Sequence, residues 1–139
     1  MKTEKIEISA LIKATPEKVW RFWTDPAHIT GWNFASEDWC CPSAENDLRV
    51  GGKYKARMEA KDGSFGFDFE GVYEEVEPFE ALAYSLPDGR NVRTSFEAKA
   101  DSTRVTTGFD PDAENDVEMQ RDGWQAILEN FKKYAETNA

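Results

Sequence analysis

The chain has 139 residues, a length typical of one domain, and we expect a single domain over residues 1–139. Acidic residues outnumber basic residues by 27 to 17, and the net charge of -10 disfavours nucleic acid and anionic membranes as partners, because both are negatively charged. No apolar stretch is long enough to span a bilayer and no apolar leader follows the first residue, so we predict a cytoplasmic protein without membrane insertion.

The first part of the chain predicts one strand followed by two short helices. Residues 5–14 (KIEISALIKA) alternate between apolar and polar side chains, which is typical of a half-buried strand. Thr15 followed by proline predicts the start of a helix over 16–24, because threonine caps helices and proline fits their first position. A second short helix is expected over 26–30 and ends at Gly31.

The middle of the chain predicts a succession of strands joined by turns. The stretch WNFASEDWCC, residues 32–41, is predicted to be a strand whose main apolar residues are Phe34 and Trp39. The Asp62–Gly63 pair is a hairpin signal. The other strands are expected at residues 53–61, 65–76, 81–86, 91–100 and 103–110.

The last segment predicts a long amphipathic helix. Apolar residues recur at helical spacing from Val117 to Tyr134, and Asn115 with Glu118 fits a variant of the capping box. Gly123 lies inside this helix, where glycine costs about 0.5–1 kcal/mol relative to alanine. We therefore expect the sheet or a crossing segment to approach the helix closely at Gly123, with Trp124 beside it in the core or in a cavity wall.

This order of elements predicts an α+β fold. The hairpin-linked strands give one antiparallel sheet of about six to seven strands, and we expect that sheet to curve around the long C-terminal helix. The two short helices after the first strand would close one end of the curved sheet.

Five stretches of the sequence carry a resemblance to a known family. They are ATPEKVWRFWTDP (14–26), GW (31–32), ENDLRVGGKY (45–54), FEGVYEEVEP (69–78) and QRDGWQAILENF (120–131). Their order and spacing resemble the helix-grip fold of the START-like (SRPBCC) superfamily, also called the polyketide cyclase or Bet v-like group. Within that superfamily the sequence is similar to the activator-of-heat-shock-protein-90-ATPase-like branch.

The resemblance implies an apolar cavity between the sheet and the C-terminal helix. It therefore implies a protein that binds a small hydrophobic or aromatic molecule in that cavity. Two alternatives stay open: a cyclase- or hydrolase-like enzyme that acts in the cavity, and a chaperone-associated interaction protein. We expect no cofactor and no metal, identify no catalytic residues, and expect a monomer or a homodimer.

Strand parity and helical spacing select the side chains expected to line the cavity. These are Trp32, Phe34, Trp39, Met58, Phe67, Phe69, Tyr84, Phe96, Gln120 and Trp124. Tyr84, Gln120 and Arg49 are the polar groups among which we look for contacts with a ligand, although the surface is the favoured place for Arg49.

The only cysteines, Cys40 and Cys41, are adjacent in the sequence. Adjacent side chains of a strand point to opposite faces, and the spaced pairs of cysteine metal sites are absent, so we expect neither a metal site nor a disulfide framework. Cys41 shares the face of Trp39 in the predicted strand and is the better candidate for a cavity wall.

Three other polar residues are weak candidates for catalysis. His28 is the only histidine and has no nearby nucleophile in the sequence, so a surface or helix-end position is expected. Asp68 and Glu70 alternate with phenylalanines and are expected to face water. A bulge that reversed this alternation would instead turn Glu70 into the cavity as an acid–base candidate.

Overall fold

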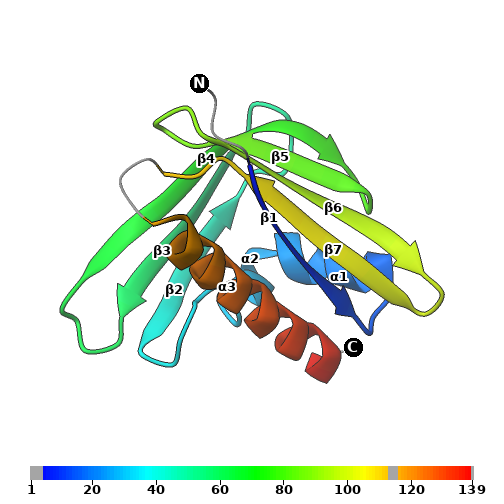
Figure 1. Cartoon of the computed structure of the whole chain (residues 1–139), viewed down its shortest axis with the longest axis horizontal. Coiled ribbons are helices and arrows are strands. Elements are labelled where there is room, and N and C mark those ends of the chain that lie inside the picture. Colours follow the sequence, from blue (N-terminus) through cyan, green and yellow to red (C-terminus); the bar gives the residue numbers. More distant parts are fainter. Residues whose placement is uncertain (1–4, 113–115, 139) are drawn as a thin grey trace.

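The computed structural model (Figure 1) describes residues 5–112 and 116–138 of the chain. Over these residues the helices are α1 (Pro16–Thr24), α2 (Pro26–Ile29) and α3 (Val117–Asn138). The strands are β1 (Ile6–Ile12), β2 (Trp39–Asn46), β3 (Lys53–Ala60), β4 (Gly66–Glu77), β5 (Ala81–Ser85), β6 (Asn91–Lys99) and β7 (Ser102–Phe109). Among the helices of these ranges, none is long and apolar enough to cross a membrane.

The strands form one antiparallel seven-stranded sheet in the order β1-β7-β6-β5-β4-β3-β2. The sheet curls around α3, which lies along its concave face (Figure 1). Helix α2 contacts the edge strand β2 while α1 contacts β6 and β7, so the two short helices join opposite sides of the sheet and close one end of its hollow. This arrangement confirms the predicted α+β helix-grip fold.

The first strand confirms the predicted alternation and also fixes the position of α3. Every second residue of β1 is buried, and α3 packs against this strand. Lys132 Nζ donates to the backbone oxygen of Leu11 at 2.9 Å, and Glu136 accepts from the backbone N–H of Lys13 at 3.0 Å. These two contacts to backbone atoms set the position of the second half of α3 along β1.

The two short helices begin at the residues that the sequence predicts. The Thr15 hydroxyl accepts from the backbone N–H of Lys18 at 3.4 Å at the start of α1. The Asp25 carboxylate accepts from the backbone N–H of Ala27 at 2.9 Å at the start of α2. Both caps satisfy backbone N–H groups that have no partner within the helix.

The predicted strand over 32–41 is wrong in its first part, because β2 begins only at Trp39. The backbone N–H groups of Trp32 and Asn33 bond to the backbone oxygen of Ile29 at 3.2 and 3.1 Å. These residues therefore continue the turn that ends α2, and their N–H groups are not available to a neighbouring strand.

Strand β2 is also irregular along its own length. Its pairing with β3 shifts in register between Cys40 and Ser43. Pro42 lies inside this shift and has no backbone N–H to donate to the ladder. The side chains of this part of β2 therefore do not alternate strictly between the two faces of the sheet.

The sequence also predicts a hairpin at Asp62–Gly63 and a capping box at Asn115. The Asp62–Gly63 hairpin is confirmed, since Gly63 has a φ of 78° and the Asp62 carboxylate accepts from the backbone N–H of Ser64 at 2.8 Å. The capping box that involves Asn115 lies outside the described residues.

The predicted close approach at Gly123 is wrong. Within residues 5–112 and 116–138, a Cβ atom at this position would meet no atom within 4 Å, its chain neighbours and the backbone of its own helix apart. Close approach occurs instead at Gly31, where a Cβ atom would lie 2.6 Å from the ring of Tyr134 on α3. The glycine that allows α3 to pack tightly thus lies in the turn after α2 and not in α3 itself.

Candidate functional site

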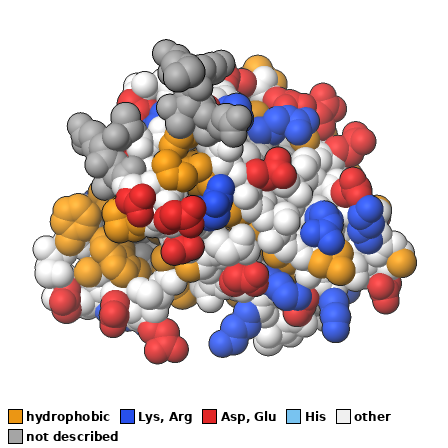
Figure 2. All heavy atoms as spheres, in the orientation of Figure 1, with side chains coloured by type: hydrophobic (Ala, Val, Ile, Leu, Met, Phe, Trp, Pro, Cys, Tyr) orange, Lys and Arg blue, Asp and Glu red, His pale blue; other side chains and the backbone are white. Residues whose placement is uncertain are grey.

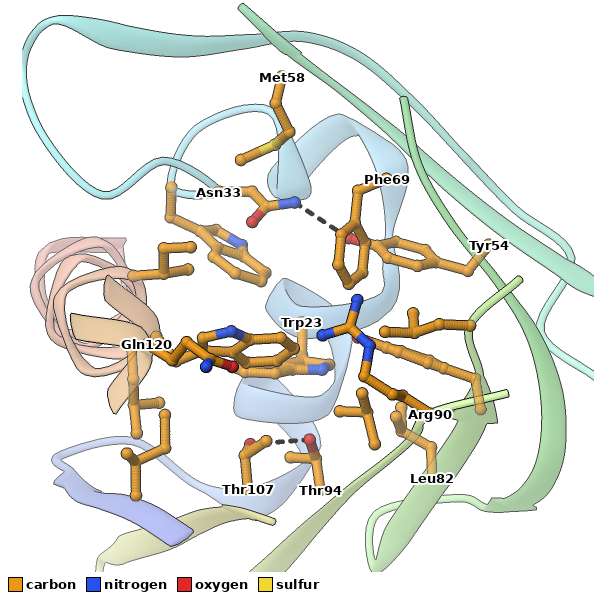
Figure 3. Close-up of a pocket in the computed structure, with 18 of the residues that line it drawn as sticks. Trp23, Asn33, Tyr54, Met58, Phe69, Leu82, Arg90, Thr94, Thr107 and Gln120 are labelled. Carbon is orange, nitrogen blue, oxygen red and sulfur yellow. Dashed lines mark hydrogen bonds between the residues drawn. The ribbon is translucent and has the colours of Figure 1, made fainter. Parts of the chain in front are cut away.

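A cavity of about 360 Å³ lies between the concave face of the sheet and α3 (Figure 3). Its lining residues come from the strands, from α1, from the turn after α2, and from α3. Small-molecule sites in proteins typically have volumes of about 300–1,000 Å³. The cavity is therefore large enough for a small organic ligand.

The floor of the cavity consists of Trp23 from α1 and Trp32 from the turn after α2. The two indole rings stack with centroids 4.9 Å apart, and Phe131 of α3 contacts both edge-on. The indole N–H of Trp32 donates to the backbone oxygen of Phe22 at 2.9 Å. The floor is thus apolar, and the polar group of Trp32 is satisfied behind it.

One side of the cavity is an aromatic wall formed by Tyr54, Phe69, Tyr84 and Trp124. Tyr54 and Tyr84 are stacked, with centroids 5.6 Å apart and ring planes 6° from parallel. Phe69 lies edge-on to Tyr84 and to Trp124, and the ring of Phe109 supports Trp124 from behind at 4.1 Å. Aromatic pairs in these geometries contribute about 0.5–1.5 kcal/mol beyond their area burial, so the wall is well ordered.

Several polar groups at one end of the cavity are hydrogen-bonded within the protein. Asn33 donates from its amide to the Tyr54 hydroxyl at 3.0 Å (Figure 3). The Tyr73 hydroxyl donates to the side-chain oxygen of Asn46 at 2.7 Å, and the Asn46 amide donates to the backbone oxygen of Thr24 at 2.6 Å. These bonds connect the sheet to α1 and to the turn after α2, so the polar groups also hold the end of the cavity together.

The three tyrosines of the cavity are neutral over the physiological pH range. Burial raises the pKa of Tyr54, Tyr73 and Tyr84 well above the ordinary phenol value, because a phenolate loses its hydration there. The neighbouring tyrosines raise the pKa of Tyr54 and Tyr84 further, while the hydrogen bond from Asn33 lowers the pKa of Tyr54 and the bond to Asn46 lowers that of Tyr73. The tyrosines therefore present hydroxyl groups and not negative charges to a ligand.

Phe67, Arg90, Asp112 and Gln120 also line the cavity and are at least partly exposed, and we call the side that they form the mouth. Phe67 is 41% exposed. The Gln120 amide accepts from the backbone N–H of Asp112 at 2.7 Å and donates to the backbone oxygen of Asp112 at 2.9 Å. This pair of bonds ties the segment after β7 to the first turn of α3 at one side of the mouth.

Exposed apolar side chains lie beside the mouth. Figure 2 shows apolar side chains gathered between the β3–β4 hairpin and the start of α3. In this region Phe65 is 60% exposed and Met119 is 58% exposed. An apolar molecule that approaches the cavity from this side would contact apolar surface before it enters.

Most of the residues predicted to line the cavity do surround it. They are Trp32, Met58, Phe67, Phe69, Tyr84, Gln120 and Trp124. Their role in ligand binding stays a prediction. Gln120 differs from the expectation in one respect, since its amide is engaged with the Asp112 backbone.

Phe34, Trp39 and Phe96 are not among the lining residues, which corrects the prediction for these three positions. Phe34 lies in the irregular segment before β2, where strand parity does not apply. Trp39 packs edge-on against Phe65 on the β3–β4 hairpin. Phe96 is buried against Trp20 of α1, because the concave face of the sheet carries the packing of α1 as well as the cavity.

Several lining residues were missed by the sequence analysis. Trp23, Tyr54, Tyr73 and Arg90 all contribute to the cavity. Tyr54 has the same strand parity as Met58, so the alternation of β3 contained the signal for it. Arg90 lies in a polar turn between β5 and β6, where no periodic pattern indicates which way a side chain points.

The candidates for other polar roles lie away from the cavity. Arg49 is on the surface, where its side chain is 75% exposed and pairs with Asp47 at 2.9 Å. His28 lies at the end of α2, as expected, and its Nδ1 is 2.7 Å from the Tyr134 hydroxyl.

Asp68 and Glu70 are both exposed, as predicted. Asp68 forms ion pairs with Lys55 at 3.7 Å and with Arg57 at 3.5 Å. The register between β3 and β4 runs without a shift through this region. The bulge that would have turned Glu70 into the cavity is therefore not present in this part of the ladder.

Cys41 is buried at 3% exposure but is not a lining residue of the cavity, which corrects the expectation for its place. Burial, with the neighbouring Cys40 as a second cause, raises the pKa of the Cys41 thiol to about 11. Its S–H donates to the backbone oxygen of Ser43 at 3.4 Å. In the described part of the chain, no group of His, Cys, Asp and Glu side chains is arranged to hold a metal ion.

Solved structures of similar proteins share this architecture. The AHSA1-like protein from Aeromonas hydrophila is 41% identical with a TM-score of 0.88, over 96% of this chain and 94% of that chain. Chr148 from Cytophaga hutchinsonii is 46% identical with a TM-score of 0.83, over 96% of this chain and 93% of that chain. CV1439 from Chromobacterium violaceum, at 24% identity and a TM-score of 0.86 over 96% of this chain and 99% of that chain, supports the fold alone.

A comparison with curated proteins found no match. Residues 13–136 match the family described as Activator of Hsp90 ATPase homolog 1-like protein. The match covers most of the chain and agrees with the identity to the Aeromonas hydrophila protein. The chain therefore belongs to the Activator of Hsp90 ATPase homolog 1-like family, with the START-like fold that the sequence analysis expected.

Proposed function

We propose that this protein binds a small hydrophobic or aromatic molecule in the cavity between the sheet and α3. The observation that carries the proposal is the aromatic cavity of about 360 Å³, with its paired polar groups and its tryptophan floor. Family membership supports the proposal, since the resemblance to the START-like superfamily implies an apolar cavity between the sheet and the C-terminal helix.

The expected strength of binding follows from the apolar area that a ligand would bury. An aromatic ligand with about the surface of a tryptophan side chain, roughly 250 Å², gains about 6 kcal/mol at 25 cal/mol per Å². Ordering of the ligand opposes this gain, so apolar contact alone supports a dissociation constant of about 0.1–1 mM or weaker. Tighter binding requires a specific polar contact.

The proposal is tested with N-phenyl-1-naphthylamine, an uncharged dye that fluoresces in apolar surroundings. The dye is titrated into the parent protein and into Ile127→Trp, because Ile127 lines the cavity from α3 and a larger side chain there fills it. The larger side chain excludes the dye by volume, so we expect at least about tenfold weaker binding in this variant.

The matched control is Leu11→Trp, which adds the same ring at an exposed position of β1. Thermal unfolding of both variants checks that they are folded. Equal dye binding by the parent and Ile127→Trp, or no dye binding by the parent, would contradict the proposal.

A further inference from the structure

We infer that the ligand is an amphipathic anion, with its apolar body in the cavity and one anionic group bound by Arg90 at the mouth. This inference rests on the proposed function, because it adds the chemical class of the molecule to the same cavity. The position of Arg90 in the lining, its hydrogen-bond partners and its exposure support the inference, and none of these depends on the aromatic wall.

The turn between β5 and β6 fixes the direction of the Arg90 side chain. The backbone N–H of Leu86 donates to the Arg90 oxygen at 2.8 Å, and the N–H of Gly89 donates to the Leu86 oxygen at 2.9 Å. The Asp88 carboxylate then accepts from the Arg90 backbone N–H at 3.1 Å and from the Arg90 Nε at 2.7 Å. The guanidinium is thus held by its Nε edge, and Figure 3 shows it pointing into the cavity.

The two terminal nitrogens of Arg90 are the part of the guanidinium available to a ligand. Asp88 is the one described carboxylate within ion-pair distance of Arg90, and it engages only the Nε atom. Asp112 also lines the cavity, but it forms no ion pair with Arg90. Within the described residues, the Nη groups have no hydrogen-bond partner.

The pair with Asp88 orients Arg90 but does not neutralise its charge in the cavity. Asp88 is 55% exposed, whereas the Arg90 side chain is only 30% exposed. An exposed carboxylate interacts mainly with water, and such pairs contribute little net stability. Arg90 is therefore a positive group at the edge of an apolar space, and Asp88 accepts from its Nε and not from its terminal nitrogens.

The chemistry of these donors selects the ligand group. The parallel N–H bonds of a guanidinium match two oxygens of a carboxylate, sulfonate or phosphate, and charge-assisted bonds of this kind are roughly twice as strong as neutral ones. The net charge of -10 does not oppose this contact strongly. Charges farther away than about 8 Å are screened at physiological ionic strength, whereas a direct pair at a partly buried site is not.

The test compares two competitors of one size that differ in charge. Naphthalene-2-carboxylate and naphthalene-2-carboxamide are each used to displace N-phenyl-1-naphthylamine, so that both are measured at the same cavity. In the parent protein we expect the carboxylate to displace the dye at about tenfold lower concentration than the amide, as one charge-assisted contact predicts.

The same competition is then measured in Arg90→Gln and in Arg93→Gln. Both variants change the net charge equally, but Arg93 lies on β6, 53% exposed and paired with Glu75. We expect Arg90→Gln to remove the preference for the carboxylate, measured as the ratio of the two displacing concentrations in that variant, so that any change in its affinity for the dye cancels. We expect Arg93→Gln to keep the preference.

The outcomes separate this inference from the proposed function. No preference in the parent, displacement by neither competitor, or a preference retained in Arg90→Gln would overturn the anion inference while dye binding still supports the cavity. Absence of dye binding in the parent would overturn both.

Discussion

The buried tyrosines of the cavity act as hydrogen-bonding groups and not as charges. Tyr54 and Tyr73 are paired with Asn33 and Asn46, and burial keeps both hydroxyls protonated. A ligand therefore meets neutral hydroxyl groups in the interior and a positive charge only at Arg90. At the residue scale, the site is built to distinguish one end of a ligand from the other.

The pKa of Cys41 gives a test of how tightly β2 is packed. Since the pKa is raised to about 11, only about 0.1% of this thiol is ionised at about pH 8, and the thiolate is the reactive form. In a Cys40→Ser variant we expect a thiol-reactive disulfide reagent to label Cys41 slowly in the folded protein and rapidly after denaturation. A Cys41→Ser variant should be labelled faster than Cys40→Ser when folded, because Cys40 is only half-buried.

The pH dependence of this thiol has a definite sign. The unfolded thiol ionises near its ordinary pKa of 9.0, before the folded one does, so its contribution to stability is lost as the pH rises from about 9 towards about 11. Labelling of folded Cys40→Ser should accelerate over the same range. Rapid labelling at about pH 8 would show that Cys41 is not enclosed.

At the scale of secondary-structure elements, α3 has two functions in the fold. Its first half carries Trp124 and Ile127 to the cavity, and its second half is fixed to β1 through Lys132 and Glu136. The helix is therefore held firmly at one end while its other end borders the mouth. The sheet and the helix can enclose open space because they pack tightly only over part of their length.

The glycines near α3 give a prediction with an internal control. Gly123→Ala should raise the free energy of unfolding by about 0.5–1 kcal/mol, because a Cβ atom there meets open space and alanine favours the helix. Gly31→Ala should lower it, because its Cβ atom would lie 2.6 Å from the Tyr134 ring and 3.2 Å from the His28 backbone oxygen. Chemical denaturation measures both, and a destabilised Gly123→Ala protein would restore the close approach that the sequence suggested.

At the scale of the whole molecule, periodic segments were predictable from the sequence and irregular ones were not. The alternation of β1 and the cap at Thr15 gave the correct elements, because these signals are local. The segment from 32 to 38 was assigned to a strand from its apolar residues alone. The backbone N–H groups of Trp32 and Asn33 instead complete the turn after α2, and the apolar composition of the segment carries no signal for that turn.

The same distinction explains which site residues were found. Met58, Phe69 and Trp124 lie on regular elements, so parity or helical spacing placed them correctly around the cavity. Arg90 was missed because the direction of a turn side chain depends on tertiary contacts, here with Asp88. The prediction for Gly123 was wrong because a glycine inside a helix is compatible with a close contact and with open space. Only the packing around the helix distinguishes these two cases.

The most direct test of the central claim uses the tryptophans as reporters of where a ligand binds. Trp23, Trp32 and Trp124 line the cavity, whereas Trp20 and Trp39 do not. The indole N–H signals of the protein are followed by nuclear magnetic resonance during titration with N-phenyl-1-naphthylamine. Assignment comes from single Trp→Phe variants.

We predict that the signals of Trp23 and Trp124 shift most, in proportion to occupancy, and that the signal of Trp20 stays nearly unchanged. This result would place the ligand between the sheet and α3. A shift confined to Trp39, which packs against the exposed Phe65, would place the dye on the outside of the β3–β4 hairpin and contradict the account. So would a titration in which no indole signal moves.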